Sequence, residues 1–287
     1  MSLLSRRRVL PALLATATVA IGLIGLGPAA AAPAGRAPAA VAAAASHPSG
    51  TKPTVVLVHG AWADSSSWTD VIIKLQHDGY TVLAAPNPLR SLSGDAATVR
   101  DFLATVPGPI ILVGHSYGGA VITNAATGNP DVKALVYIDA FAPAQGETIF
   151  PLSGADSALA VDPATVFDFR PYPGAPAGDV DLYLKPAVVA RSFAQDVGRQ
   201  KAAVLAATQR PLALSAGNEP SGVPAWKTIP SWYLLGTQDK IITPTAQRFM
   251  AERAHSHITL VRSSHVSLIS HPAAVESLVV KAARATA

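Results

Sequence analysis

Residues 110–119 read Ile-Ile-Leu-Val-Gly-His-Ser-Tyr-Gly-Gly, an apolar run that leads into a Gly-x-Ser-x-Gly motif. Small residues that suit a helix follow, so a strand must turn into a helix within about two residues. Ser116, at the apex, is then forced into a strained backbone conformation with its hydroxyl exposed. Gly114 and Gly118 leave room for the strand and the helix to approach each other. The segment predicts a nucleophile elbow; the alternative is an ordinary strand–glycine–helix junction without chemistry.

The N-terminal residues have the composition of an export signal. Residues 5–8 are Ser-Arg-Arg-Arg, residues 9–27 are apolar, and alanines fill positions 29–32. A basic start, an apolar core and small residues in this order are typical of a secretory signal peptide, and the paired arginines resemble the twin-arginine type. We therefore expect residues 1–31 to be removed and the protein to be secreted, without stable membrane association. An uncleaved anchor is the alternative, because about 19 apolar residues can span a bilayer.

The charge balance argues against a nucleic-acid partner. The sequence has 22 basic and 18 acidic residues, and residues 1–31 contain three arginines and no acidic residue. The remainder therefore holds 19 basic against 18 acidic side chains, without a further Lys/Arg cluster. The sequence contains no cysteine, which excludes disulfides, thiol catalysis and thiolate metal sites.

Residues 32–52 are rich in Pro, Ala, Gly and Ser and predict a flexible linker, which leaves residues 53–287 for one folded domain. Continuous apolar runs typical of buried strands alternate with helical segments along this domain. This pattern predicts an α/β fold with a mostly parallel, doubly wound sheet that helices cover on both faces. The expected strands are residues 54–58, 80–85, 110–113, 132–138, 231–235 and 257–261. Helices are expected from Ser65 until Gly79 ends the first, over 94–106, from Pro244, and from Pro272 to about Arg284.

The alternation breaks between about residues 141 and 228, where prolines are frequent. This stretch contains two strand-like pieces, 166–170 and 181–184, and two helical pieces, 186–197 and 199–208. Because the sheet pattern resumes after the insertion, we expect a cap over the carboxyl edge of the sheet. The alternative is an elaborated surface without a functional role.

A serine nucleophile needs a histidine base at the same edge of the sheet. Open α/β sheets carry their chemistry on the loops that follow the carboxyl ends of the strands. His265 lies on the loop after the expected strand 257–261, so we favour it as the base for Ser116. His271 is the alternative, although its position before Pro272 is also that of an ordinary helix-entry residue.

Two aspartates compete to orient the histidine. Asp239 lies just past the expected strand 231–235, and Asp139 ends the expected strand 132–138. Either carboxylate could reach a histidine at this edge, and we favour Asp239. For Asp139 the alternative role is to accept hydrogen bonds from loop amides.

Ser116, Asp239 and His265 follow one another in the order nucleophile, acid, histidine. Together with the elbow, this order resembles the α/β-hydrolase fold superfamily over residues 53–285. Further segments resemble its small esterase and hydroxynitrile-lyase-like branch, namely residues 58–68, 141–143, 236–253 and 264–265.

The resemblance implies roles for several further residues. The backbone amides of Ala61 and Tyr117 would form the oxyanion hole. Trp62, Trp68 and Phe141 are candidates for the wall of the substrate pocket, with core packing as the alternative for each. The histidines beside the oxyanion positions, His59 and His115, are expected to brace their loops.

The implied activity is hydrolysis of a small-molecule carboxylic ester through an acyl-enzyme intermediate. Hydroxynitrile lyases of this branch carry a lysine near the catalytic histidine, whereas residues 266–268 contain none; Lys240 keeps that alternative open. A cofactor-free perhydrolase and a non-catalytic binding protein of the same fold are further alternatives. Neither a metal-ligand cluster nor a phosphate loop stands out, so no cofactor is expected.

Overall fold

The computed structural model describes residues 52–287. The expected signal peptide and nearly all of the expected linker lie outside the described residues. None of the helices within residues 52–287 combines the length and the apolar character needed to cross a membrane.

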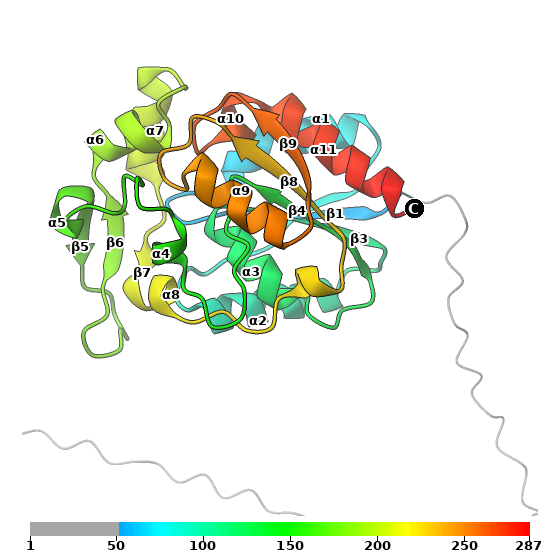
Figure 1. The fold of residues 1–287 in the computed structure, drawn as a ribbon, viewed down its shortest axis with the longest axis horizontal. Coiled ribbons are helices and arrows are strands. Elements are labelled where there is room, and N and C mark those ends of the chain that lie inside the picture. The colour runs from blue at the N-terminus through cyan, green and yellow to red at the C-terminus, as the bar shows by residue number, and fades with distance from the viewer. Residues whose placement is uncertain (1–51) are drawn as a thin grey trace, which may run out of the picture. The chain divides into compact units, whose positions relative to one another are not determined.

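A six-stranded sheet forms the centre of the described domain (Figure 1). Its strand order is β2-β1-β3-β4-β8-β9, and every neighbouring pair is parallel, which confirms the expected α/β class. Because all strands run the same way, the loops that follow them meet at one edge of the sheet. The strands are β1 (Thr54–Val58), β2 (Val82–Ala84), β3 (Ile110–His115), β4 (Val132–Ile138), β8 (Ser231–Gly236) and β9 (His257–Val261).

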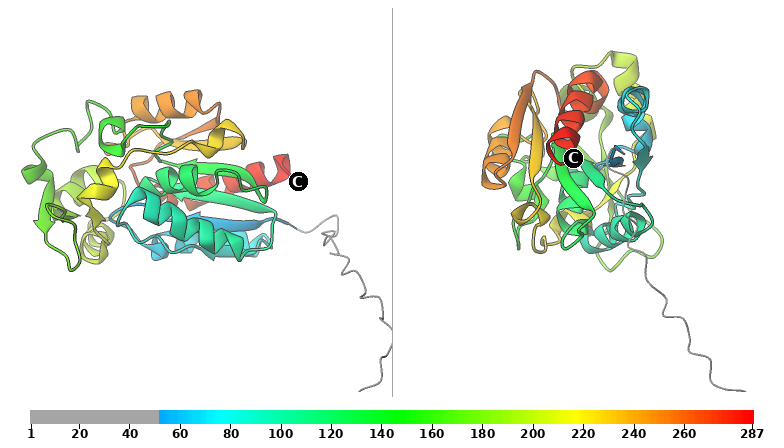
Figure 2. Two further views of the ribbon diagram at one scale, coloured as in Figure 1. Left: turned by 90° about the horizontal axis from the view of Figure 1, so that it is seen from below. Right: turned by 90° about the vertical axis from the view of Figure 1, so that its right-hand side faces the viewer.

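Helices cover both faces of the sheet, as Figure 2 shows. Two of them, α1 and α11, pack against each other, and α2 packs on α3. The helices begin where the sequence offers caps: Ser91 accepts from the amide of Gly94, and Thr243 accepts from the amide of Ala246. The principal helices are α1 (Thr69–His77), α2 (Leu92–Ala104), α3 (Tyr117–Ala125), α9 (Pro244–Arg253), α10 (Ser267–Ser270) and α11 (Pro272–Ala285), with a short 3₁₀ helix, η1 (Ser65–Trp68), before α1.

The inserted stretch between β4 and β8 carries its own antiparallel sheet, in the order β5-β6-β7. We call residues 141–228 the cap. The expected helix over 186–197 is divided: α6 gives way to a wider π-helical turn, η2, in which the amide of Ala194 donates to the carbonyl of Val189 (2.9 Å). The cap elements are α4 (Ile149–Leu152), α5 (Pro163–Val166), β5 (Phe167–Arg170), β6 (Asp181–Leu184), α6 (Pro186–Val188), η2 (Val189–Phe193), α7 (Arg199–Thr208), β7 (Leu212–Ala213), α8 (Leu214–Asn218) and η3 (Ala225–Lys227).

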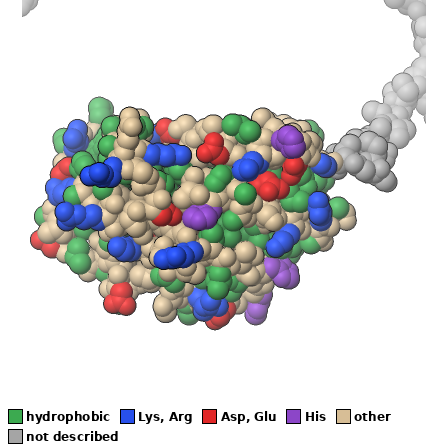
Figure 3. Space-filling model, turned by 90° about the horizontal axis from the view of Figure 1, so that it is seen from above, with side chains coloured by type: hydrophobic (Ala, Val, Ile, Leu, Met, Phe, Trp, Pro, Cys, Tyr) green, Lys and Arg blue, Asp and Glu red, His purple; other side chains and the backbone are tan. Residues whose placement is uncertain are grey.

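One apolar core joins the sheet to the cap. Apolar side chains of β1, β3 and β4 are almost fully buried, as expected for strands covered on both faces. The same cluster includes Phe167, Leu182 and Phe193 of the cap. On the face drawn in Figure 3, Lys and Arg side chains lie dispersed among acidic, apolar and uncharged ones.

Candidate active site

Ser116 occupies the turn between β3 and α3, with a backbone φ of 52°. Residues with a side chain rarely adopt this left-handed conformation, so the surroundings must hold it in place. The amides of Gly119 and Phe141 both donate to the carbonyl of Ser116, at 2.9 and 3.1 Å. A Cβ at Gly118 would lie 2.5 Å from the carbonyl of Val58, so only glycine allows this approach. The structure therefore has the strained strand–turn–helix geometry of an elbow.

His265 joins Ser116 to Asp239. Its Nε2 lies 2.8 Å from the hydroxyl of Ser116, and its Nδ1 lies 2.7 Å from Oδ2 of Asp239. The three residues come from the loops after β3, β8 and β9, and each is at most 3% exposed. The structure thus brings together the three side chains expected from the sequence.

Asp239 is held by donors on several sides. The amides of Ile241 and Ile242 donate to its Oδ1, at 2.7 and 3.1 Å, and Nε2 of Gln247 donates to Oδ2 at 2.8 Å. Burial raises the pKa of Asp239, and these donors oppose that shift because they stabilise the charged form. The donor set suits an ionised carboxylate that accepts a hydrogen bond from Nδ1–H of His265.

Asp139 occupies a different place. Its Oδ2 accepts from the amide and the hydroxyl of Ser267, at 3.1 and 2.5 Å, and no hydrogen bond to His265 is formed. The geometry therefore favours Asp239 over Asp139 as the partner of the histidine. Burial raises the pKa of Asp139, and the nearby charge of Asp239 adds to the shift.

The protonation state of His265 follows from its burial. Desolvation lowers its pKa to about 3, so the imidazole is neutral near pH 7. With Nδ1 donating to Asp239, its Nε2 is left as an acceptor for the hydroxyl proton of Ser116. This is the tautomer that a general base needs.

Two further histidines brace the neighbouring loops. Nε2 of His115 donates to the carbonyl of His265 (2.8 Å), which ties the end of β3 to the loop of His265. Burial lowers the pKa of His115, so it is neutral. Nδ1 of His59 lies 2.9 Å from the carbonyl of Gly60. Among the hydrogen bonds of residues 52–287, none joins the ring of His59 or His115 to the hydroxyl of Ser116.

The candidate oxyanion residues flank the serine. Tyr117 is the first residue of α3, where a backbone N–H has no acceptor within the helix. The loop of Ala61 approaches from β1, and a Cβ at Gly60 would lie 2.6 Å from Cβ of Ser116. This close approach requires a glycine before Ala61, and it brings the loop beside Ser116.

Trp62 ties the loop of Ala61 to the cap. Its φ is 57°, again in the left-handed region. Its backbone N–H donates to the carbonyl of Arg210, and its indole Nε1 donates to the carbonyl of Leu182, both at 2.9 Å. Its ring packs against Phe167 and Phe193, with centroids 5.6 and 6.3 Å apart.

The other two pocket candidates are buried. Trp68 is fully buried, and its ring lies edge-on to His115, with centroids 6.3 Å apart. Phe141 is 2% exposed, and its amide supports the carbonyl of Ser116. Sequence reasoning missed Phe193, whose ring centroid lies 5.2 Å from that of His265. The apolar pattern of residues 186–197 marks Phe193 as buried, but it does not reveal the π-helical turn that precedes the contact.

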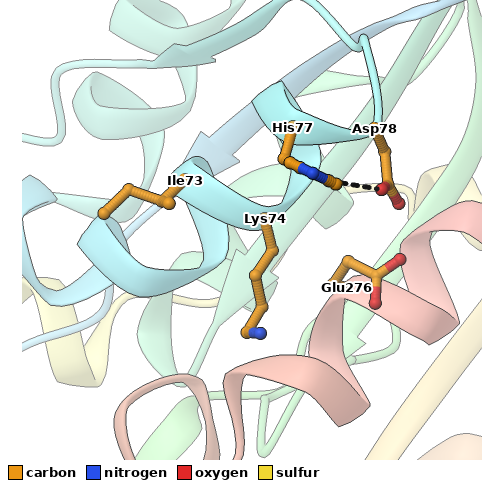
Figure 4. A pocket seen from close by; sticks show the side chains of 5 residues that line it. All are labelled: Ile73, Lys74, His77, Asp78 and Glu276. Carbon is orange, nitrogen blue, oxygen red and sulfur yellow. Dashed lines mark hydrogen bonds and ion pairs between the residues drawn. The ribbon is translucent and has the colours of Figure 1, made fainter.

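A separate surface pocket of about 400 Å³ is lined by α1 and α11 (Figure 4). His77 and Asp78 face each other there, with 3.5 Å between Nδ1 and Oδ1, and Lys74 and Glu276 lie beside them. It contains no serine or other nucleophile paired with a base. Within residues 52–287, no group of three or more His, Cys, Asp or Glu side chains is arranged to hold a metal ion.

Comparison with known proteins relates the chain to one family. Residues 55–278 match the model of the "Alpha/beta hydrolase family". The chain is 38% identical over 110 residues to a carbendazim hydrolyzing esterase of Nocardioides sp. (strain SG-4G), a match that covers 34% of this chain and 46% of that protein. It is 34% identical over 111 residues to a pyrethroid hydrolase of Sphingobium wenxiniae, covering 34% of this chain and 39% of that protein. The matched segments thus span less than half the length of these two relatives.

Among solved structures, the fold is similar to that of polyneuridine aldehyde esterase. The TM-score is 0.67 at 18% identity, and the alignment covers 80% of this chain and 99% of that chain.

Proposed function

This chain belongs to the alpha/beta hydrolase family, and we propose that it hydrolyses carboxylic esters through an acyl-enzyme intermediate on Ser116. One observation carries the proposal: the imidazole of His265 bridges the hydroxyl of Ser116 and the carboxylate of Asp239, at 2.8 and 2.7 Å. The relatives that match this chain carry the names of an esterase and of a hydrolase, which supports the reaction class.

In the first half-reaction, Nε2 of His265 takes the proton of the Ser116 hydroxyl while the oxygen attacks the ester carbonyl. The carbonyl oxygen gains negative charge, which the amides of Ala61 and Tyr117 stabilise. Two such preset donors are worth roughly 10²–10³ in rate each. The imidazolium is stabilised by Asp239, and it then protonates the departing alkoxide.

In the second half-reaction, the neutral His265 takes a proton from water, which attacks the acyl carbonyl on Ser116. The tetrahedral intermediate uses the same two amides, and its collapse releases the carboxylic acid. His265 returns the proton to the serine oxygen, so no cofactor takes part in the cycle.

The position of Lys240 gives no support to the lyase alternative. Its Nζ donates to the carbonyl of Arg191 in the cap (3.2 Å), and it forms no hydrogen bond with the triad within the described residues. A perhydrolase would use the same triad, so product analysis with and without hydrogen peroxide distinguishes that reaction from hydrolysis.

The decisive experiment compares the wild-type chain with Ser116→Ala on p-nitrophenyl esters of graded acyl length. We expect turnover to fall by at least roughly 10⁴. A fluorophosphonate probe should label the wild type at Ser116 and leave the variant unlabelled. A variant with near-normal turnover contradicts the mechanism, and a wild type inert to both probe and esters favours a binding-only protein.

We also propose that the enzyme is exported and acts outside the cytoplasm. This proposal rests only on the sequence of residues 1–31. Expression of the full chain in a host with a twin-arginine pathway should yield exported protein cleaved near Ala31. Replacing Arg6 and Arg7 by lysine should abolish that export. An uncleaved, membrane-retained product would support the signal-anchor alternative.

A further inference from the structure

A short cap segment contacts the loops on which two of the triad members lie. We call residues 191–196 the cap clamp; it begins in η2 and ends before α7. Nε2 of Gln195 donates to the carbonyl of Gln238 (2.7 Å), the residue before Asp239. Nζ of Lys240, the residue after Asp239, donates to the carbonyl of Arg191. The cap clamp thus contacts both neighbours of the triad acid in the chain.

The strongest contacts of the cap clamp are those of Asp196 with the histidine loop. Its Oδ2 accepts from the amide of Ser264 (2.8 Å), and its Oδ1 accepts from the hydroxyl of Ser264 (2.5 Å). Oδ2 also accepts from the hydroxyl of Ser270 (2.9 Å). Ser264 immediately precedes His265 and is fully buried. Without Asp196, two donors of a buried residue would lose their acceptor, which is costly.

The hydroxyl of Ser264 extends this support to the other neighbour of the histidine. While it donates to Asp196, it accepts from the amide of Val266 (3.3 Å). The residues before and after His265 are therefore fixed by one carboxylate, and the ring of Phe193 packs on the imidazole from the same segment. The carbonyl of His265 is held separately by His115.

We propose that Asp196 is a positioning residue for the reaction assigned above: from the cap, it holds the loop that aims His265 at Ser116. It touches neither substrate nor reacting atoms, and it acts through Ser264. The inference rests on the proposed function. It also makes catalysis dependent on the docking of the cap, because a cap that moves away takes the acceptor of Ser264 with it.

The consequence for rate follows from the geometry of proton transfer. A displacement of a catalytic group by about 1 Å can cost about 10²-fold. We therefore expect Asp196→Ala to lower kcat by about 10- to 100-fold while KM changes little. Asp196→Asn retains one acceptor oxygen for Ser264, so its kcat should lie between those of Asp196→Ala and the wild type.

Rescue by the conservative variant separates positioning from mere loss of cap stability. A purely structural defect would lower Tm in Asp196→Ala and Asp196→Asn alike, whereas positioning through Ser264 predicts that the oxygen kept in Asp196→Asn restores part of kcat at an unchanged KM. The matched control is Asp168→Asn, which removes a cap carboxylate paired with Lys185 and should leave kcat unchanged.

The experiment measures kcat and KM on a p-nitrophenyl ester, the rate of fluorophosphonate labelling, and Tm for each variant. A double-mutant cycle with Ser264→Ala should be strongly non-additive, because both changes remove the same contact. Wild-type kcat and labelling rate in Asp196→Ala overturn the inference. An equal loss in Asp168→Asn, or a kcat in Asp196→Asn no higher than that in Asp196→Ala, also overturns it.

The labelling rate separates the inference from the function on which it rests. A wild type that hydrolyses no ester and is not labelled refutes the proposed function, and the role of Asp196 with it. A wild type that is labelled at the same rate as Asp196→Ala refutes only the role of Asp196.

Discussion

The six-stranded sheet and the cap are held together by different means. The strands β1, β3 and β4 are parallel, apolar and almost fully buried, and they leave few alternatives for pairing. The cap has strands of two to four residues, and polar contacts on its surface supply part of its cohesion, such as the ion pair between Lys185 and Asp168. The sheet can therefore place reacting groups rigidly, whereas the cap can vary its contacts with less loss of stability.

The two regions meet at His265, which makes the contrast testable. From the sheet side, His115 holds its backbone carbonyl, and from the cap side, Asp196 holds its neighbour Ser264. Changes at the strand ends should alter the chemical step, and changes in the cap should alter substrate choice, alignment or stability by smaller amounts.

The largest expected loss of activity distinguishes the roles of Asp239 and Asp139 at the edge of the sheet. Asp239→Asn should lower kcat by roughly 10⁴, because its oxygen stays with the amides of Ile241 and Ile242 and its NH2 then faces His265, donates to Nδ1 and holds the wrong tautomer. Asp139→Asn keeps an acceptor for Ser267 and should cost far less. Steady-state kinetics on one ester measures both, and a larger loss in Asp139→Asn would assign the acid role to Asp139.

An intermediate effect is expected where the cap covers the histidine. Phe193→Ala removes a fully buried ring and should cost about 3–5 kcal/mol of unfolding free energy, measured by urea denaturation. The space left beside His265 should also raise the relative kcat/KM for bulky acyl or alcohol groups. If the preference among esters of graded size stays unchanged, Phe193 contributes to packing alone.

The acid limb of catalysis tests the buried environment that both regions create. Burial lowers the pKa of His265 from 6.5 to about 3, so the base stays unprotonated as the pH falls through 6. We expect kcat/KM to stay constant as the pH falls through the range in which a free histidine titrates, and to decline only at lower pH. A limb centred at or above 6.5 would show that solvent reaches the imidazole.

The same shift predicts a loss of stability in acid. In the unfolded chain His265 binds a proton below about pH 6.5, whereas in the folded chain it does not until the pH approaches about 3. Between these values the unfolded state binds more protons, so the free energy of unfolding falls as the pH falls. His265→Gln should flatten this dependence in urea denaturation between pH 6 and 4.

The smallest effect is expected on the cap surface. Asp168→Asn breaks the ion pair with Lys185, both side chains of which are partly exposed. Such pairs are worth about 0–1 kcal/mol, so Tm should change by only a few degrees and kcat should not change. A large loss of activity would mean that the cap transmits strain to the triad from any point on its surface.

The sequence is sufficient for the features that depend on local pattern. The strained turn at Ser116 follows from its flanking glycines, and parallel strands send Asp239 and His265 to the same edge as the serine. Phe193 and Asp196 could not be assigned in this way. Their contacts depend on the π-helical turn of η2 and on how the cap packs against the loop of Ser264, and neither is encoded in the spacing of apolar residues. The strand β2 (Val82–Ala84) is also shorter than the strand expected over residues 80–85.

The bonds of Trp62 have a consequence for selectivity. Trp62 is bonded to the carbonyls of Leu182 and Arg210, and it directly follows Ala61, the proposed oxyanion donor. An ester large enough to push β6 outward would therefore also displace the loop of Ala61. Oversized esters would then be admitted but processed slowly, and the enzyme would discriminate by turnover more than by affinity.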